Sequence, residues 1–156
     1  MTLTLGKNMQ ESMIAVSPIG LEDFLALLPP IQESEELGDL GVSIAADEGR
    51  VFAKGPLIGL LGEAVAKEAS RNGKSTFTIW DDEAQNYQLS RFEGGASSDR
   101  VEVSGYDVIE DTMGVTEVGR NVADWRDLNL DGAWEWATGE ISYWDLPWHN
   151  YRAADT

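Results

Sequence analysis

The chain contains no cysteine and a single histidine, His149, among its 156 residues. Disulfides and thiolate nucleophiles are therefore excluded, and zinc would lack its usual ligands. Catalysis of the nucleophile–His–acid type would have to run through His149. Long apolar runs are also missing, since no stretch approaches the roughly 20 apolar residues that span a membrane. The lack of cysteine fits a reducing compartment, and we expect a cytoplasmic protein.

Positive charge is scarce. The chain has 11 Lys and Arg residues against 28 Asp and Glu residues, a formal net charge of −17. A content of 42% hydrophobic residues is typical of a folded protein, so the acids must be displayed on a folded surface. Such a surface repels nucleic acid and anionic membranes and attracts basic proteins. We therefore expect a basic protein partner and no direct contact with nucleic acid or membrane.

Length and local pattern predict one α+β domain over residues 1–156, with residues 1–12 as a flexible arm. Ser17-Pro18 is expected to open a helix that ends at Pro29-Pro30. Gly55-Pro56 is expected to open a second helix that runs to about Ser70. This pattern predicts two helices.

Residues outside these helices show strand patterns. Val42 and Ile44 lie before Asp47-Glu48-Gly49, and the apolar run 51–53 follows it. This pattern predicts a β-hairpin over residues 42–53. Residues 75–80 and 87–92 alternate with a period of two, and Val101 with Val103 begins another such run. Val115 and Val118 suggest one more strand. The predicted fold is two helices packed on a mainly antiparallel sheet.

Five of the six tryptophans lie within 24 residues: Trp125, Trp134, Trp136, Trp144 and Trp148. Asp131-Gly132 and Thr138-Gly139 punctuate this stretch and predict short strands with tight turns, a Trp-rich C-terminal hairpin region. Large aromatic rings dominate both cores and interfaces. The rings therefore either complete the core or form a protein-binding or sugar-binding platform.

Asp127, Asn129 and Asp131 match the first ligands of a calcium-binding loop, and Gly132 stands at its sixth position. The twelfth position, where a bidentate glutamate should close the loop, is Thr138. These three residues are thus a weak calcium site, and we expect no tightly bound cofactor. An Asp-Gly hairpin turn is the competing interpretation.

Residues 132–139, followed by Tyr143-Trp144, are similar to the G-x-W-x-W-x-x-G stretch of C-type lectin domains. The family's disulfides and its calcium and sugar motif are absent. The resemblance implies an alternative function, a calcium-dependent or carbohydrate-binding module on residues 124–148.

Carboxylate pairs offer a second alternative, a small hydrolase. Asp81-Asp82-Glu83 and Glu110-Asp111 place acids side by side in the sequence. Nothing in the pattern favours one pair over another, and we expect no enzymatic activity.

The leading hypothesis is a non-enzymatic inhibitor or binding protein that blocks a basic functional surface of a partner. Residues 99–145 contain twelve acids and three bases, a net charge of −9. The partner would be a nuclease-like toxin, if the chain is an immunity protein, or a nucleic-acid-binding defence enzyme, if it is a phage mimic of nucleic acid. The predicted binding residues are Asp107, Glu110, Asp111, Glu117, Asp124, Asp127, Trp134, Trp136, Trp144 and Trp148.

Overall fold

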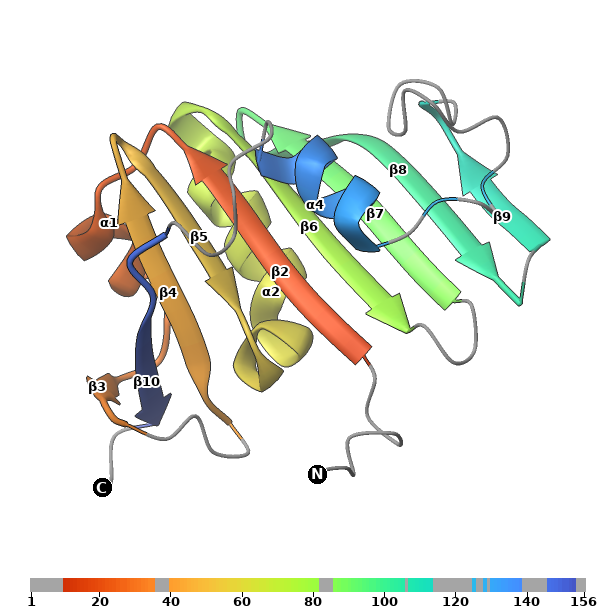
Figure 1. Cartoon of the computed structure of the whole chain (residues 1–156). Coiled ribbons are helices and arrows are strands. Elements are labelled where there is room, and N and C mark those ends of the chain that lie inside the picture. The colour runs from red at the N-terminus through yellow and green to blue at the C-terminus, as the bar shows by residue number, and fades with distance from the viewer. Residues whose placement is uncertain are drawn as a thin grey trace.

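The computed structural model describes residues 10–35, 40–81, 86–105, 107–113, 125, 128, 130–138 and 146–153. Its centre is one nine-stranded sheet in the order β3-β10-β4-β5-β2-β6-β7-β8-β9 (Figure 1), and every neighbouring pair of strands is antiparallel. The strands are β2 (Gln10–Ser17), β3 (Ile31–Glu33), β4 (Val42–Asp47), β5 (Arg50–Lys54), β6 (Lys74–Asp81), β7 (Asn86–Glu93), β8 (Ala96–Ser104), β9 (Asp107–Asp111) and β10 (His149–Ala153). The helices of the described residues are α1 (Leu21–Leu25), α2 (Pro56–Ala69), the 3₁₀ turn η2 (Ser70–Asn72) and α4 (Leu130–Thr138).

The predicted fold is wrong in its balance of helix and sheet and in its Trp-rich C-terminal hairpin region, whereas two helices packed on an antiparallel sheet are roughly consistent with the structure. The molecule is a single antiparallel sheet with one main helix, α2. The first predicted helix shrinks to the five residues of α1, because Ser17 ends β2 instead of capping a helix. The expected hairpin turn at Asp131-Gly132 lies inside α4. The local preference of Asp-Gly for a turn yields to the packing of the helix, in which Ala133 is buried in the core.

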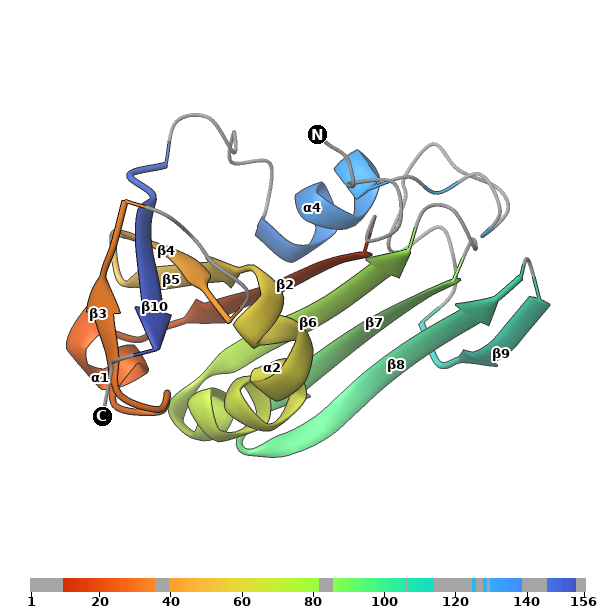
Figure 2. The ribbon, with the colours of Figure 1, turned by 90° about the horizontal axis from the view of Figure 1, so that it is seen from below.

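Sequence alternation did not reveal β2, which lies near the middle of the sheet. Ser12–Val16 are all buried, because α2 covers one face of the sheet and α4 covers the other (Figure 2). A strand that is buried on both faces reads as a continuous apolar run and has no period of two. Gln10–Ser12, which were expected to belong to an arm, begin this strand.

Other local predictions are confirmed. β4 and β5 form the expected hairpin, and its turn places Glu48 and Gly49 at φ values of 48° and 80°. Both residues are in the left-handed region, which a tight two-residue hairpin turn requires. The second predicted helix is α2, and the alternating runs at 75–80 and 87–92 are β6 and β7.

Each face of the sheet has its own core. On the α2 face, Phe24 of α1 and Ile58 of α2 pack with sheet residues such as Ile14 and Phe77. On the α4 face, one cluster is built around Trp80 and Trp125, and a second around Phe52. None of the described helices is both long and apolar enough to cross a membrane.

Tyr151 is expected to make the stability of the fold depend on pH in the alkaline range. It lies on β10 between β3 and β4, where burial, and then the charge of Glu33, raise its pKa above the ordinary value of 10.0. A raised folded-state pKa stabilises the fold below pH 10, and this stabilisation is lost as pH rises through the folded pKa. We expect Tyr151→Phe to lose less unfolding free energy than the wild type above pH 10, as measured by urea unfolding at a series of pH values. Equal losses in the two proteins would contradict this.

Candidate protein-binding edge

β9 forms one end of the sheet, and β3 forms the other (Figure 1). All five residues of β9 are exposed. The strand pairs with β8 on one side, and no strand among the described residues pairs with its other side. An edge strand presents backbone N–H and C=O groups that another strand can join.

Two apolar side chains stand on this edge strand. Val108 is 47% exposed and Ile109 is 60% exposed. A register shift between Glu102 and Val103 leaves Ile109 as an extra residue with no partner of its own on β8. This bulge bends the strand and interrupts its regular pairing. The edge therefore combines exposed apolar surface with a row of acids.

One face of the edge carries an ionic cluster, which we call the Arg100 cluster: Arg100, Glu63, Glu102 and Glu110. The Arg100 guanidinium lies 3.2 Å from a carboxylate oxygen of each of the three glutamates. One cation among three carboxylates leaves a net charge of −2. The four side chains are between 33% and 54% exposed, so water screens the pairs and they contribute little to stability. Their excess negative charge remains at the surface.

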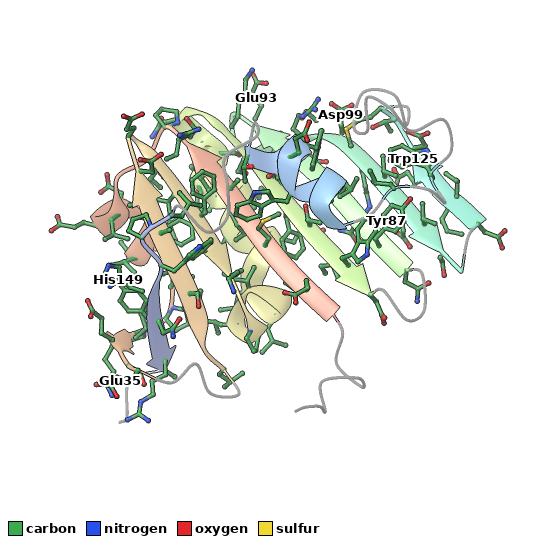
Figure 3. All side chains as sticks on the ribbon, viewed as in Figure 1. Glu35, Tyr87, Glu93, Asp99, Trp125 and His149 are labelled. Atoms are coloured by element: carbon green, nitrogen blue, oxygen red, sulfur yellow. The ribbon has the colours of Figure 1, made fainter. Side chains whose placement is uncertain are left out.

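Asp111 has a structural contact on the opposite face. Its Oδ2 accepts a hydrogen bond of 2.8 Å from the indole nitrogen of Trp125, and its Oδ1 accepts one of 3.0 Å from the backbone N–H of Met113. The Tyr87 hydroxyl donates to the carbonyl oxygen of Trp125, and Tyr87 and Trp125 lie close together at this end of the sheet (Figure 3). Asp111 thus positions a core ring.

The neighbouring acids Glu110 and Asp111 do not form a catalytic pair. Glu110 contacts Arg100, which shares its face with Glu63 of α2, whereas Asp111 contacts Trp125 on the α4 side of the sheet. Successive residues of a strand point to opposite faces, so the two carboxylates diverge. Asp82 and Glu83, from the other suggested group, lie outside the described residues.

The described tryptophans of the C-terminal third pack against the core. Trp125 is 5% exposed. Trp134 and Trp148 are partly buried beside Phe52, with 6.3 Å between their ring centroids. Trp136 is partly buried against the Trp80 cluster. Exposed rings suited to an interface are therefore not found among these four, and the apolar surface of the edge comes from Val108 and Ile109.

Several predicted residues lie outside the described part of the chain: Glu117, Asp124, Asp127, Asn129 and Trp144. Asp131 lies in helix α4, and within the described ranges no group of three or more His, Cys, Asp or Glu residues could hold a metal ion. His149 is exposed on β10, at the end of the sheet opposite Trp125 (Figure 3). Of the predicted acids, the structure brings together Asp107, Glu110 and Asp111 on β9.

Sequence reasoning missed Glu63, Arg100, Glu102, Val108 and Ile109. The run Asp107–Asp111, in which two apolar residues stand between acids, was the available signal for an exposed strand. The partners of Arg100 come from α2, β8 and β9, and no local pattern connects them.

Comparison of the chain with protein-family models, with curated proteins and with solved structures found no match. Function is therefore inferred from the sequence and from the geometry of this edge.

Proposed function

We propose that the chain is a non-enzymatic binding protein that covers a basic surface of a partner protein, with β9 and the Arg100 cluster as its contact surface. The observation that carries this is the composition of β9, a fully exposed edge strand in which Val108 and Ile109 stand among Asp107, Glu110 and Asp111. Acids speed and orient the encounter with a basic partner, and apolar contacts slow its dissociation.

The same acids argue against a second copy of the chain as the occupant of this edge. Pairing of β9 with another β9 would place carboxylates of one copy near those of the other, and opposed like charges destabilise a strand pair. Acids on an edge strand, together with a bulge, are also a common protection against self-association. A basic segment meets no such repulsion.

Strand addition is the mode of binding that this edge suits best. An extended segment that joins β9 would gain main-chain hydrogen bonds, and its side chains would alternate between the two faces. Basic side chains on the face of Glu110 would meet the net charge of −2 of the Arg100 cluster. The candidate partners are a nuclease-like toxin and a nucleic-acid-binding defence enzyme, since both carry basic surfaces that bind nucleic acid.

The proposal predicts a partner whose association depends on salt and on β9. Proteins captured from a lysate by the tagged chain would be identified by mass spectrometry, and the association rate of each purified partner measured. Raising salt from about 0.05 to about 0.5 M should slow association at least tenfold, because the Debye length falls well below 10 Å. The double variant Asp107→Lys/Glu110→Lys should lower the rate about tenfold at the lower salt.

Glu11→Lys is the matched control, because Glu11 is also an exposed acid on a strand but lies on β2. Glu11→Lys changes the net charge by half as much as the β9 double variant does. Glu11→Lys/Glu22→Lys, which adds a second exposed acid from α1, therefore has the same change in net charge as the β9 double variant. Both controls should leave most of the rate intact. A partner that binds the β9 variant and the matched controls equally fast would contradict a binding role for this edge.

A further inference from the structure

The sheet face beneath α4 contains a pocket of about 170 Å³, bounded by β2, β5, β6, β7 and the last turn of α4. Small side chains make this space. Ala15 lies between Phe52 of β5 and Thr76 of β6, and Thr76 lies opposite Arg91 of β7. Ala137 of α4 completes the lining. The pocket is thus a trough of small residues between a ring and a guanidinium.

The charged side chains that line the pocket are all basic, in contrast to the acidic chain as a whole. Arg50, Lys74 and Arg91 line it, and no Asp or Glu residue is among its eleven lining residues. In the whole chain the acids outnumber the bases 28 to 11. Three cations from three strands therefore meet at one place in a protein that otherwise repels anions.

Each of these cations also contacts a carboxylate that does not line the pocket. The pairs are Arg50 Nη2 with Asp47 Oδ2 at 2.9 Å, Arg91 Nη1 with Asp99 Oδ2 at 3.1 Å, and Lys74 Nζ with Glu93 Oε1 at 3.9 Å. A guanidinium carries five N–H donors in a fixed fork, so the contact with Asp47 uses only part of the donor set of Arg50. These ion pairs fix the positions of the cations beside the pocket.

Aromatic rings hold the two arginines as well. The Arg50 guanidinium lies 5.7 Å from the centroid of Phe52, and that of Arg91 lies 5.5 Å from Trp136. Their side chains are 32% and 28% exposed, whereas that of Lys74 is 71% exposed. The two arginines are therefore the better-ordered cations of the pocket, and Lys74 lies at its solvent side.

The pocket also has a polar atom without a partner. The buried Oγ1 of Thr76 has no hydrogen-bond partner among the described residues. Buried hydroxyl groups in proteins are nearly always hydrogen-bonded. Because this oxygen has almost no accessible surface, a molecule in the open pocket does not reach it, and the charged end of a ligand is left to the two arginines.

The remaining lining indicates the body of the ligand. Ala15, Phe52 and Ala137 make most of the pocket apolar. An apolar cavity of about 150 Å³ takes up benzene, so this pocket has room for one ring or a branched chain of that size. An inorganic anion would leave this apolar surface without contacts.

We propose that this pocket binds a small organic carboxylate, with the carboxylate on Arg50 and Arg91 and a ring-sized apolar body against Phe52 and Ala137. This site is independent of the β9 edge and of the function proposed for it. The competing explanation is that the cations serve only the carbonyl groups at the C-terminal end of α4, which attract positive charge.

Benzoate and benzamide are suitable probes, because they have the same shape and differ in charge. Titration of the ¹⁵N-labelled full chain should give saturable shifts of the Thr76 and Ala137 amide signals with benzoate. The apparent Kd for benzamide and for inorganic phosphate should be at least tenfold higher, because a charge-assisted hydrogen bond or the ring contact is lost. Non-saturating shifts, or equal binding of benzoate and benzamide, would overturn the proposal.

Arg50→Met keeps much of the apolar stem of the side chain but removes the guanidinium, and it should raise the benzoate Kd about tenfold or more. Lys74→Met is the alternative variant if Arg50→Met does not fold. Lys67→Met removes an exposed cation of α2 on the other face of the sheet and should leave the Kd unchanged. Equal effects of Arg50→Met and Lys67→Met would show screening of the net charge instead of a site. If Arg50→Met lost stability and the wild type showed no saturable benzoate binding, the role of the cations would be only to stabilise the C-terminal end of α4.

Discussion

Replacing Trp125 with alanine is expected to lower the free energy of unfolding by about 3–5 kcal/mol, the usual cost of removing a large buried ring. Trp125 is 5% exposed and packs with Tyr87, whose own ring stacks on Trp80 with 4.1 Å between the centroids. The substitution would also remove the indole donor to Asp111. In a domain of this size such a loss lowers Tm by roughly 6 to 20 °C.

Urea unfolding followed by circular dichroism measures this change, with Asp111→Asn as the control. Asparagine keeps an oxygen acceptor for the indole N–H and loses only the exposed acceptor of the Met113 N–H, so Asp111→Asn should cost about 1 kcal/mol. The result decides between the two interpretations of the tryptophans. If Trp125→Ala left stability intact and abolished partner binding, this ring would belong to an interface, contrary to its burial.

Elements that are defined by local chemistry could be predicted from the sequence. Asp47-Glu48-Gly49 gives the β4–β5 hairpin because a tight turn needs residues that tolerate positive φ. Pro56 at the start of α2 and the apolar stripe that follows gave the main helix within a residue of its bounds. Neither element needs information from a distant part of the chain.

Elements that depend on distant contacts could not be predicted. β2 is buried on both faces by α2 and α4, so its sequence does not show the period of two that identifies a half-buried strand. β10 lies between β3 and β4, more than 100 residues earlier in the chain, and no sequence pattern gives this order. α4 contains Asp131-Gly132, whose local preference for a turn yields to the packing of Ala133 and Trp136 on the sheet.

The candidate site divides in the same way. Composition gave an acidic surface in the C-terminal part of the chain, and Asp107 and Glu110 are exposed there. Composition could not distinguish Asp111, because its contact with Trp125 depends on how the chain returns to the sheet fourteen residues later. It also gave no sign of the pocket with three cations, which meet only because β5, β6 and β7 lie near one another in the sheet.

A side chain at Gly62 of α2 is the second change expected to have a large effect on stability. A Cβ atom at this position would lie 2.2 Å from Cε1 of the Phe77 ring and 2.7 Å from Cδ1. Phe77 is 2% exposed and is part of the α2-face core, so its ring has little room to move. The helix approaches β6 this closely only because residue 62 has no side chain. The next residue, Glu63, contacts Arg100, so the position of α2 also sets one side of the Arg100 cluster.

Gly62→Val is therefore expected to lower the free energy of unfolding by about 3 kcal/mol, at the upper end of the usual cost of overpacking, because even its first added carbon overlaps the ring. Ala64→Val is the control. Ala64 is exposed on the same helix, so this variant reports only the weaker helix propensity of a β-branched residue, about 0.5 kcal/mol. Equilibrium urea unfolding of both variants gives the comparison.

The double variant Gly62→Val/Phe77→Leu should be more stable than the sum of the two single changes predicts, since the smaller leucine leaves space for the valine. Strict additivity of the two changes, or equal costs for Gly62→Val and Ala64→Val, would show that the helix shifts away from β6 without strain. In that case the Arg100 cluster would owe its geometry to β8 and β9 alone.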